Sequence, residues 1–268
     1  MSPAMEPRRP GHDVAAAAIW QARREGRLLD PDAVLGRLDL DAAFGVQRHL
    51  VALRVAAGEQ VVGWKLGYTS EVMRRQMGVD RPNFGPLTDA MVLPDGGVVA
   101  AHLVQPRVEP EVAVRLARPL APRPEGVTRA DVAASLATAH ACLEVVHSTW
   151  VDYRFTLEQN TADNSSAGQL VLGPELPLDA LDEVEVSLAD GTAELGRGRG
   201  ADAFGHPLDA VAWLATQLSA RGDELRAGDI VLTGGLTRAW PLEPGGRLTA
   251  RFQPVGGEAV EVSVRRAG

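Results

Sequence analysis

The chain has 268 residues, of which 45% are hydrophobic, and its 27 basic and 35 acidic side chains give a formal net charge of −8. This acidic balance excludes the basic surface that sequence-independent nucleic-acid binding requires, and the single cysteine, Cys142, excludes an internal disulfide. No apolar run approaches the roughly 20 residues of a membrane-spanning helix. We therefore expect a cytoplasmic protein with neither a membrane nor a nucleic-acid partner.

The N-terminal part of the chain favours helices. Residues 1–12 are typical of a disordered tail, because the basic residues there precede no apolar signal-peptide core. Apolar residues at helical spacing then predict one helix ending at Gly26 and another from about Leu40 to Ala57. We expect the helical region as a whole to cover residues 13–75.

From Val61 onward, short β-branched runs separated by glycine and proline turns predict strands. Two helices interrupt them. One begins with a capping-box-like pattern after Thr128 and is expected to continue to Leu143, and the other begins at Pro207, which suits a first helical turn. Because strands and helices do not alternate strictly, the pattern predicts an α+β fold, with residues 76–268 forming one β-rich domain.

Lys65 is the only lysine of the chain, since the other 26 basic side chains are arginines. It stands between Trp64 and Leu66 in an apolar stretch. Arginine stays protonated at any accessible pH, whereas a desolvated lysine can release a proton and take it back. The stretch therefore favours proton chemistry at Lys65 over an accidental surface lysine.

The segment "RVEPEVAVRL" (107–116) alternates as a strand does, so Glu109 and Glu111 share one face, about 6–7 Å apart. Two like charges at this spacing favour a positive partner, and a divalent cation is the natural one. The alternative is an edge strand with a solvated polar face balanced by the flanking arginines. Pro110 fits that alternative, because proline is tolerated in edge strands.

A third carboxylate, Glu144, lies among apolar residues in "ACLEVVHS". An acid in such surroundings is rarely buried without a partner. With the two glutamates of the first strand it would form an oxygen-donor site suited to Mg²⁺ or Mn²⁺. His147 follows three residues later, a spacing that faces one metal if the segment is helical, although "LEVV" is equally typical of a strand.

The segment "QNTADNSSAG" (159–168) concentrates polar side chains between two apolar runs, including Asp163, Ser165 and Ser166. One interpretation is a loop that hydrogen-bonds a carboxylate substrate. The other is an ordinary turn rich in asparagine and aspartate. The residues alone leave both interpretations open.

Taken in order, "VGWKLGYTS", "QPRVEPEVAVRL", "CLEVVHS" and "TADNSSAGQLVLG" resemble the 2-keto-4-pentenoate hydratase / 4-oxalocrotonate decarboxylase family of the fumarylacetoacetase-like superfamily, over about residues 40–264. The resemblance implies a mixed β-roll of the fumarylacetoacetase C-terminal-like type with an N-terminal helical region, usually in a homo-oligomer. It also implies a lyase of the meta-cleavage catabolism of aromatic compounds, acting on 2-hydroxy-dienoic or 2-keto acids.

The same resemblance implies a set of site residues. Lys65 matches the active-site lysine, and Asp163 becomes a second catalytic candidate. The implied ligands of Mg²⁺ or Mn²⁺ are Glu109, Glu111 and Glu144. The implied substrate-binding residues are Leu66, Asn83, Gln105, Asn164, Ser165 and Ser166.

Three functions stay open. We expect a hydratase that adds water to 2-hydroxypenta-2,4-dienoate-like acids, and "QPR" before Glu109 favours it. The first alternative, favoured by "TGGLT", is decarboxylation of a 4-oxalocrotonate-type 2-keto diacid. The second is a non-catalytic partner of a sister pathway enzyme, because Asn83 and His147 replace residues that are common in the family.

Overall fold

The computed structural model describes residues 11–70, 74–75, 78–121, 123 and 125–268. The helices are α1 (His12–Glu25), α2 (Pro31–Val34), α3 (Leu40–Ala56), α5 (Arg129–Ser135), α6 (Leu157–Ala162) and α7 (Pro207–Ser219), with 3-10 turns η1 (Asp89–Met91), η2 (Val151–Tyr153), η3 (Asn164–Ser166) and η4 (Gly200–Asp202). The strands are β1 (Val61–Gly67), β2 (Asn83–Thr88), β3 (Val92–Leu93), β4 (Arg107–Leu116), β5 (Leu136–Val146), β6 (Ala167–Leu176), β7 (Glu185–Asp190), β8 (Ala193–Arg199), β9 (Ile230–Leu232), β10 (Trp240–Pro241), β11 (Arg247–Gln253) and β12 (Val260–Arg265).

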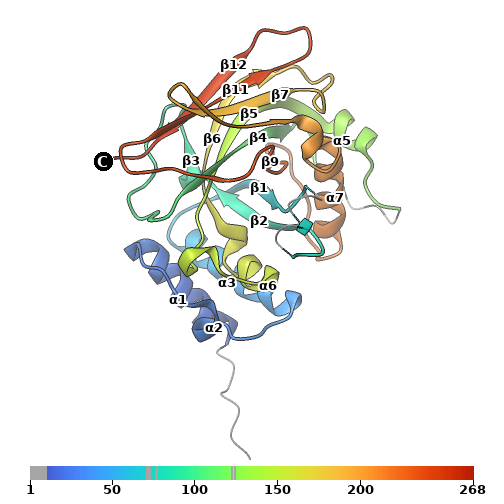
Figure 1. Ribbon diagram of the computed structural model, residues 1–268. Coiled ribbons are helices and arrows are strands. Elements are labelled where there is room, and N and C mark those ends of the chain that lie inside the picture. Colours follow the sequence, from blue (N-terminus) through green and yellow to red (C-terminus); the bar gives the residue numbers. More distant parts are fainter. Residues whose placement is uncertain (1–10, 71–73, 76–77, 122, 124) are drawn as a thin grey trace, which may run out of the picture.

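Two sheets form the β body of the molecule. Among the described residues, the larger sheet has eight strands in the order β2-β1-β9-β4-β5-β6-β3, and β10 pairs with β4 beside this path. It is mixed, because β1 runs parallel to β9 and β3 parallel to β6, whereas the other pairs are antiparallel. The smaller sheet, β12-β11-β7-β8, lies above it in Figure 1. This arrangement confirms the predicted α+β class.

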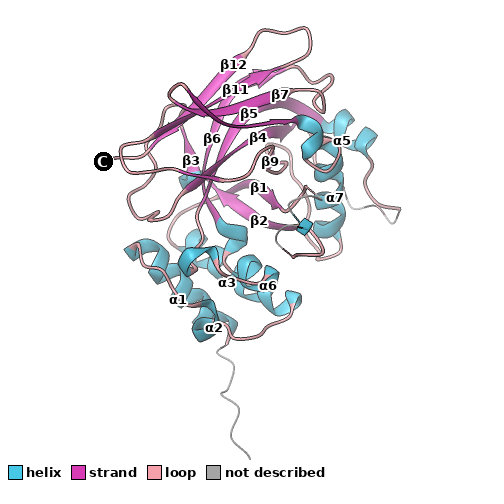
Figure 2. Ribbon diagram, in the orientation of Figure 1, coloured by secondary structure: helices cyan, strands magenta, loops and turns pink. Residues whose placement is uncertain are grey.

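Helices lie in two groups around the larger sheet (Figure 2). At the bottom of the view, α1, α2, α3 and α6 form a helical layer next to β1 and β2. This layer has an apolar core of its own, which includes Ile19, Leu50 and Trp150. Trp150 shows that the layer is not built from the N-terminal segment alone, because the chain returns to it between β5 and β6.

The second group consists of α5 and α7, which pack on each other beside the sheet. α7 begins at Pro207 as predicted, and the ring Nδ1 of His206 accepts a hydrogen bond from the backbone N–H of Leu208. α5 begins with the predicted capping box of Thr128 and Asp131.

The helix expected to continue from Thr128 to Leu143 is wrong beyond its first part. It ends at Ser135, and the chain continues from Leu136 as β5, between β4 and β6. Most of this strand is buried on both faces, so the alternation of polar and apolar residues that marks a half-exposed strand is missing. The pairing with both neighbours decides the conformation, and local sequence preference does not.

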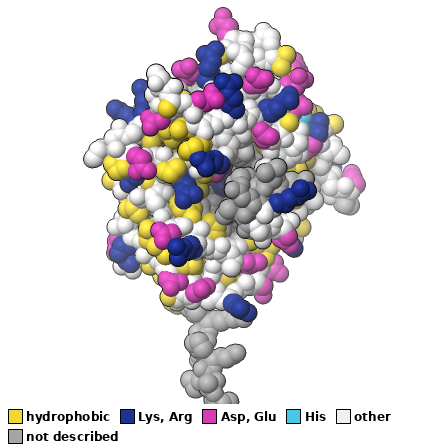
Figure 3. All heavy atoms as spheres, in the orientation of Figure 1, with side chains coloured by type: hydrophobic (Ala, Val, Ile, Leu, Met, Phe, Trp, Pro, Cys, Tyr) yellow, Lys and Arg dark blue, Asp and Glu magenta, His cyan; other side chains and the backbone are white. Residues whose placement is uncertain are grey.

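The expected boundary between helical region and β domain also lies earlier in the structure. α3 ends at Ala56, and β1, from Val61, is already an inner strand of the larger sheet. The expected tail falls mostly outside the described residues, and its last residue, His12, is the first of α1. On the face shown in Figure 3, basic and acidic side chains are interspersed.

Candidate active site

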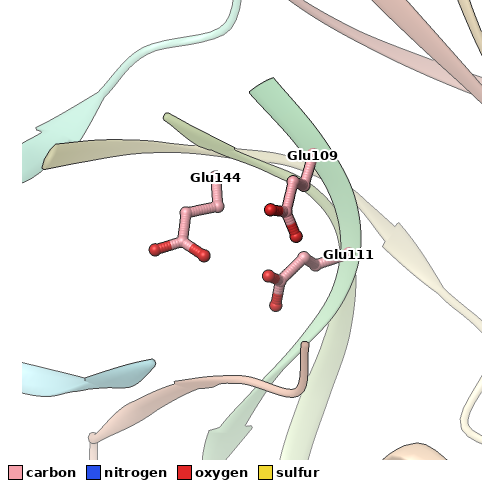
Figure 4. A group of neighbouring side chains, drawn as sticks. All are labelled: Glu109, Glu111 and Glu144. Carbon is pink, nitrogen blue, oxygen red and sulfur yellow. The ribbon is translucent and has the colours of Figure 1, made fainter. Parts of the chain in front are cut away.

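Three glutamate side chains meet on one face of the larger sheet. Glu109 and Glu111 are two residues apart on β4 and therefore point to the same side. Glu144 lies directly opposite Glu109 in the antiparallel register of β4 and β5. One carboxylate oxygen of each residue lies within 4.8 Å of the others, and Figure 4 shows the carboxyl groups turned toward a shared space. We call these three residues the carboxylate cup.

β4 is an inner strand, which contradicts the edge-strand alternative. It pairs with β5 on one side, and with β9 and then β10 on the other. Pro110 falls in the interval between β9 and β10, and its carbonyl accepts a hydrogen bond from the N–H of Leu236 in the loop that joins them. The proline nitrogen faces that same side, so its missing N–H costs no hydrogen bond to β5.

The carboxylate cup is largely withdrawn from solvent. Glu111 is fully buried and Glu144 is 1% exposed, while Glu109 is half-buried. The backbone N–H of Gly234 donates to one oxygen of Glu111 at 2.7 Å. Within the described part of the chain, the other Glu111 oxygen and Oε2 of Glu144 have no hydrogen-bond donor.

Lys65 reaches the carboxylate cup from β1, two strands away from β4. Its Nζ lies 3.1 Å from Oε1 of Glu144 and donates to the backbone carbonyl of Ser165 at 3.0 Å. Burial by itself lowers the pKa of Lys65, but the carboxylates of Glu144, Glu111 and Glu109 outweigh it and raise that pKa above its usual value. Lys65 is therefore an ammonium at neutral pH.

The pKa values of all three glutamates in the carboxylate cup are raised, because three buried carboxylates lie close together. Burial, and then the neighbouring Glu144, raise the pKa of Glu109 to about 7. Burial and the two other carboxylates raise the pKa of Glu111 well above its usual value, and burial raises that of Glu144. One lysine does not compensate three buried carboxylates, so additional positive charge at this place would be stabilising.

A divalent ion fits these residues. The donors are carboxylate oxygens, which Mg²⁺ and Mn²⁺ prefer, and two of the buried oxygens lack any hydrogen-bond donor among the described residues. The three oxygens that lie within 4.8 Å of one another leave the remaining ligand positions to water or substrate.

A glycine-containing loop, residues 233–239, crosses the carboxylate cup between β9 and β10. A Cβ atom on Gly235 would lie only 1.8 Å from Oε2 of Glu109. Gly234 has a φ of 113°, and a Cβ there would lie 1.9 Å from Oγ1 of Thr69. Gly234 thus requires glycine because of its φ angle, and a side chain at Gly235 would displace the carboxylate of Glu109. In the sequence these residues appear as "TGG" after a strand-like run, which does not by itself predict a close approach to the carboxylate cup.

A left-handed turn, Asn164–Ser166, carries the carbonyl that binds Lys65. Its three residues have φ angles of 56°, 53° and 56°, a conformation that costs each non-glycine residue about 1–2 kcal/mol. Side-chain hydrogen bonds hold the turn: Ser165 Oγ donates to Asn83 at 2.6 Å, and Asn160 donates to Ser166 Oγ at 2.6 Å. Strain maintained in this way is typical of functional sites.

A cavity of about 300 Å³ opens beside the carboxylate cup and Lys65. Its walls combine aromatic side chains with two arginines and with polar groups of the left-handed turn. Lining residues include Lys65, Leu66, Tyr68, Arg107, Glu109, Tyr153, Phe155, Ser165, Ser166 and Arg238. Tyr68, Arg107, Tyr153, Phe155 and Arg238 were not predicted as site residues, because strand and turn patterns do not indicate which loops meet over a sheet.

Of the six predicted substrate-binding residues, three line this cavity: Leu66, Ser165 and Ser166. The other three lie outside its wall. Asn83 donates to Asn160 and Thr161, Asn164 donates to the carbonyl of Pro86, and Gln105 donates to the carbonyls of Ser148 and Trp150. Direct substrate contact by Asn83, Gln105 and Asn164 is therefore not supported by the geometry; their contacts support the site walls.

Asp163, the second catalytic candidate, lies outside the cavity wall as well. It is completely buried, and its carboxylate accepts hydrogen bonds from Arg23 Nε at 2.9 Å and from Thr149, both backbone N–H and hydroxyl, at 2.7 Å. Its oxygens are thus directed at the helical layer. These contacts favour a structural role for Asp163, which holds the end of the turn, and direct catalysis by Asp163 stays a prediction.

His147 does not join the carboxylate cup. The segment is a strand, so a residue three positions after Glu144 does not share its face. His147 is 1% exposed, and neither ring nitrogen has a hydrogen-bond partner in the described part of the chain. Burial and the nearby Arg23 lower the pKa of His147 to about 3. It is a neutral, buried side chain.

A search of the described helices finds none with the length and apolar character needed to span a membrane.

Comparison with known proteins identifies relatives along nearly the whole chain. The model of the family "Fumarylacetoacetate (FAA) hydrolase C-terminal" matches residues 60–265. A 2-keto-4-pentenoate hydratase from Burkholderia vietnamiensis is 39% identical over 247 residues, which are 90% of this chain and 93% of the relative. A 2-hydroxyhexa-2,4-dienoate hydratase from Comamonas testosteroni is 34% identical over 249 residues, which are 89% and 92% of the two chains.

Comparison with solved structures indicates the same family. A 4-oxalocrotonate decarboxylase from Pseudomonas putida G7, solved with magnesium and adipate, superposes with a TM-score of 0.88 at 31% identity, covering 95% of this chain and 97% of that one. The predicted β-roll of the fumarylacetoacetase type is thereby confirmed. The chain belongs to the 2-keto-4-pentenoate hydratase / 4-oxalocrotonate decarboxylase family within the fumarylacetoacetate hydrolase superfamily.

Proposed function

We propose that this chain is a divalent-metal-dependent lyase that adds water to 2-hydroxypenta-2,4-dienoate-like acids and gives 4-hydroxy-2-keto acids. The single observation that carries the proposal is the carboxylate cup beside the only lysine of the chain, facing a cavity of about 300 Å³. The hydratases among the relatives support it.

Glu109, Glu111 and Glu144 would hold Mg²⁺ or Mn²⁺. A bound divalent ion supplies Lewis-acid stabilisation of the negative charge that develops on the oxygens of a 2-keto acid during the reaction. The chain supplies the geometry, because β4 and β5 fix the three carboxylates before any ligand arrives.

Lys65 holds a proton at Nζ, between Glu144 and the carbonyl of Ser165. In a hydration, the far end of the dienol receives a proton and water then adds at C4. The ammonium is placed at the cavity wall to donate that proton or to orient the water. Tyr68, Tyr153 and Phe155 line the cavity, and their aromatic rings would limit the water around the reacting atoms.

The proposal is tested by incubating purified protein and Mg²⁺ with the dienol and following the loss of its ultraviolet absorbance. Glu111→Gln keeps the shape of the side chain but removes its charge, so we expect activity to fall at least about 100-fold. Glu194→Gln, at an exposed acid on β8, is the matched control and should keep full activity. Equal rates for wild type and Glu111→Gln would contradict the proposal.

Decarboxylation of a 2-keto diacid is the second candidate, and two arginines favour it. Arg107 and Arg238 line the cavity, and each lies over an aromatic ring, at 4.1 Å from Tyr153 and 3.6 Å from Trp240. No ion pair of either arginine is found among the described residues, so both can bind a second carboxylate. The Pseudomonas putida decarboxylase was solved with adipate, itself a diacid.

The two reactions are separated by their products. Carbon dioxide release from a 4-oxalocrotonate-type diacid identifies the decarboxylase, and dienol consumption without it identifies the hydratase. Arg238→Gln should weaken the diacid reaction more than the monoacid reaction.

We further propose that the chain works in the cytoplasm as a homo-oligomer. Size-exclusion chromatography with light scattering tests the oligomeric state. If the chain turns over neither substrate but binds a sister pathway enzyme, the reading as a non-catalytic partner holds.

A further inference from the structure

We propose that Arg23 of α1 is a positioning residue that holds Lys65 in its reactive place by clamping the left-handed turn Asn164–Ser166. The inference rests on the proposed function, because it concerns the same lysine, but its test includes a readout that does not depend on turnover.

Arg23 is a charged residue on the buried stripe of its helix. The buried positions of α1 are Ala15, Ala16, Ile19, Ala22 and Arg23, which follow helical spacing along one face. Arg23 is only 3% exposed and pairs with the fully buried Asp163 at 2.8 Å. A buried guanidinium on an otherwise apolar face needs all its donors satisfied. Its acceptors are the carboxylate and carbonyl of Asp163 and the carbonyls of Ala167 and His147.

The guanidinium connects the two ends of the turn. Nη2 donates to the carbonyl of Asp163 at 2.9 Å, just before the turn, and Nη1 donates to the carbonyl of Ala167 at 2.8 Å, just after it. Nε donates to the Asp163 carboxylate at 2.9 Å. A planar fork with several donors can make these contacts at once, whereas the compact ammonium of a lysine cannot reach them all.

The middle of the turn carries the contact with the catalytic lysine. The carbonyl of Ser165 accepts from Lys65 Nζ at 3.0 Å. Because three successive residues hold positive φ angles, the turn would relax to a commoner conformation if its ends were released. Relaxation would rotate the Ser165 carbonyl away from Lys65 and leave the ammonium with Glu144 alone.

The carboxylate cup does not depend on this clamp. Glu109, Glu111 and Glu144 project from β4 and β5, whose pairing keeps one register from Arg107 to Arg115. None of the contacts of Arg23 involves these residues. Loss of Arg23 should therefore impair the placement of Lys65 while the metal ligands stay in position.

The first experiment compares kinetics and metal binding in two variants. Arg23→Lys keeps the charge but not the fork, and the double variant Arg23→Gln with Asp163→Asn removes the buried ion pair without leaving an unpaired charge. We expect kcat for the dienol to fall about 10- to 100-fold in both, since small misplacements of a reacting group have effects of this size. The Kd for Mn²⁺ should stay within about threefold of wild type, because the sheet holds the glutamates.

Ile19→Ala is the matched control for general loosening of the helical layer. Ile19 lies on the same face of α1 as Arg23 but is fully buried in the apolar core of that layer. The variant should lower the Tm at least as much as Arg23→Lys and keep kcat within about twofold of wild type at 25 °C. If Ile19→Ala lost as much kcat as Arg23→Lys, the loss would be structural and the inference would be overturned.

The second experiment observes the lysine directly. Because Lys65 is the only lysine, protein labelled with [¹³Cε]-lysine gives one lysine signal, whose chemical shift reports its surroundings. In the Arg23→Gln, Asp163→Asn double variant we expect this signal to move toward that of free lysine or to split, while Ile19→Ala leaves it in place. An unchanged signal with unchanged kcat would refute the positioning role.

The two experiments also separate this inference from the proposed function. If wild type consumes neither dienol nor diacid, the proposed function fails, and the lysine signal alone decides whether Arg23 positions Lys65. If wild type is active and Arg23→Lys loses kcat and Mn²⁺ affinity together, the positioning role fails and the proposed function stands.

Discussion

The carboxylate cup and the left-handed turn both bind the ammonium of Lys65 but are built in different ways. The cup stands on two paired strands, and the strand alternation and register alone bring Glu109 and Glu144 face to face. The turn takes three residues through positive φ angles. Its conformation depends on contacts from the neighbouring α6 and from α1 and β2, which are distant in sequence.

This difference teaches where precision in the site comes from. A group on a sheet inherits its position from many backbone hydrogen bonds, so one substitution elsewhere moves it little. A group on a strained turn depends on a few side chains, and each of them becomes essential for the geometry. Substitutions in the two regions should therefore affect metal binding and proton transfer separately.

The largest effect is expected where the two regions meet, at Lys65. Lys65→Arg keeps a positive charge beside Glu144, but a guanidinium does not release a proton at accessible pH. We expect kcat to fall about 1000-fold, within the range for loss of a general acid or base. The Kd for Mn²⁺, measured by electron paramagnetic resonance, should change little. A variant with kcat near wild type would mean that Lys65 acts only through its charge.

Gly235→Ala tests the carboxylate cup alone. The added Cβ would overlap Oε2 of Glu109, so either that carboxylate or the loop has to move. We expect the affinity for Mn²⁺ to fall about 10- to 100-fold, as for other changes that disturb ligand orientation. Gly196→Ala is the control, because its new Cβ would have no atom nearer than 3.3 Å. Equal Mn²⁺ affinity in all three proteins would contradict the assigned ligand set.

His147 contacts the left-handed turn, and its buried ring makes the folding stability depend on pH. Its backbone N–H donates to the carbonyl of Ser166 and its carbonyl accepts from Arg23. The pKa of His147 is lowered to about 3 by burial and by the neighbouring charge of Arg23. An unfolded chain binds the proton near pH 6.5, so the contribution of this residue to folding stability decreases as the pH falls from about 6.5 toward 3.

His147→Leu removes this dependence without removing a side-chain hydrogen bond made within the described part of the chain. The free energy of unfolding of wild type relative to the variant should decrease by about 1 kcal/mol between pH 7 and pH 5.5. Urea titrations at both pH values measure it. The carboxylate cup has raised pKa values and acts in the opposite sense, so only the difference between the two proteins is informative. A difference that does not vary with pH would show that His147 titrates normally.

The smallest effect is expected from relieving backbone strain at a positive φ angle, compared between a residue outside the site and one inside it. Ala180 has a φ of 55° in the connection between β6 and β7, at the other end of β6 from the turn. Ala180→Gly should raise the free energy of unfolding by up to about 1 kcal/mol and the Tm by roughly 1–3 °C. Ser165→Gly should give no such gain, because it also removes the hydrogen bond to Asn83. A gain of equal size in both variants would mean that the turn is not held by its side chains.

The sequence allowed the carboxylate cup to be predicted, because strand alternation in 107–116 determines which side chains share a face. Lys65 was found as the chain's only exception to arginine. The helix starts at Thr128 and Pro207 were equally local signals and are confirmed.

Long-range features could not be predicted in this way. β5 was misassigned because its pairing with β4 and β6, and not its composition, makes it a strand. Asp163 was expected to act on substrate, whereas its partner Arg23 lies 140 positions earlier in the chain. One signal was present: an arginine on the apolar stripe of α1 indicates a buried anionic partner, although it does not say which one.

β4 has an unpaired stretch between its partners β9 and β10, and this stretch affects how the substrate cavity can change by mutation. β9 and β10 anchor separately to β4, and the seven residues between them, 233–239, close the cavity without contributing a strand to the sheet. Thr233 and Leu236 are buried and hydrogen-bonded to β4, so residues 237–239 are the part of this loop that can change while the strands beneath keep their register. A few substitutions in this loop could thus adapt the cavity to a different substrate tail, while the glutamates on the sheet keep their positions.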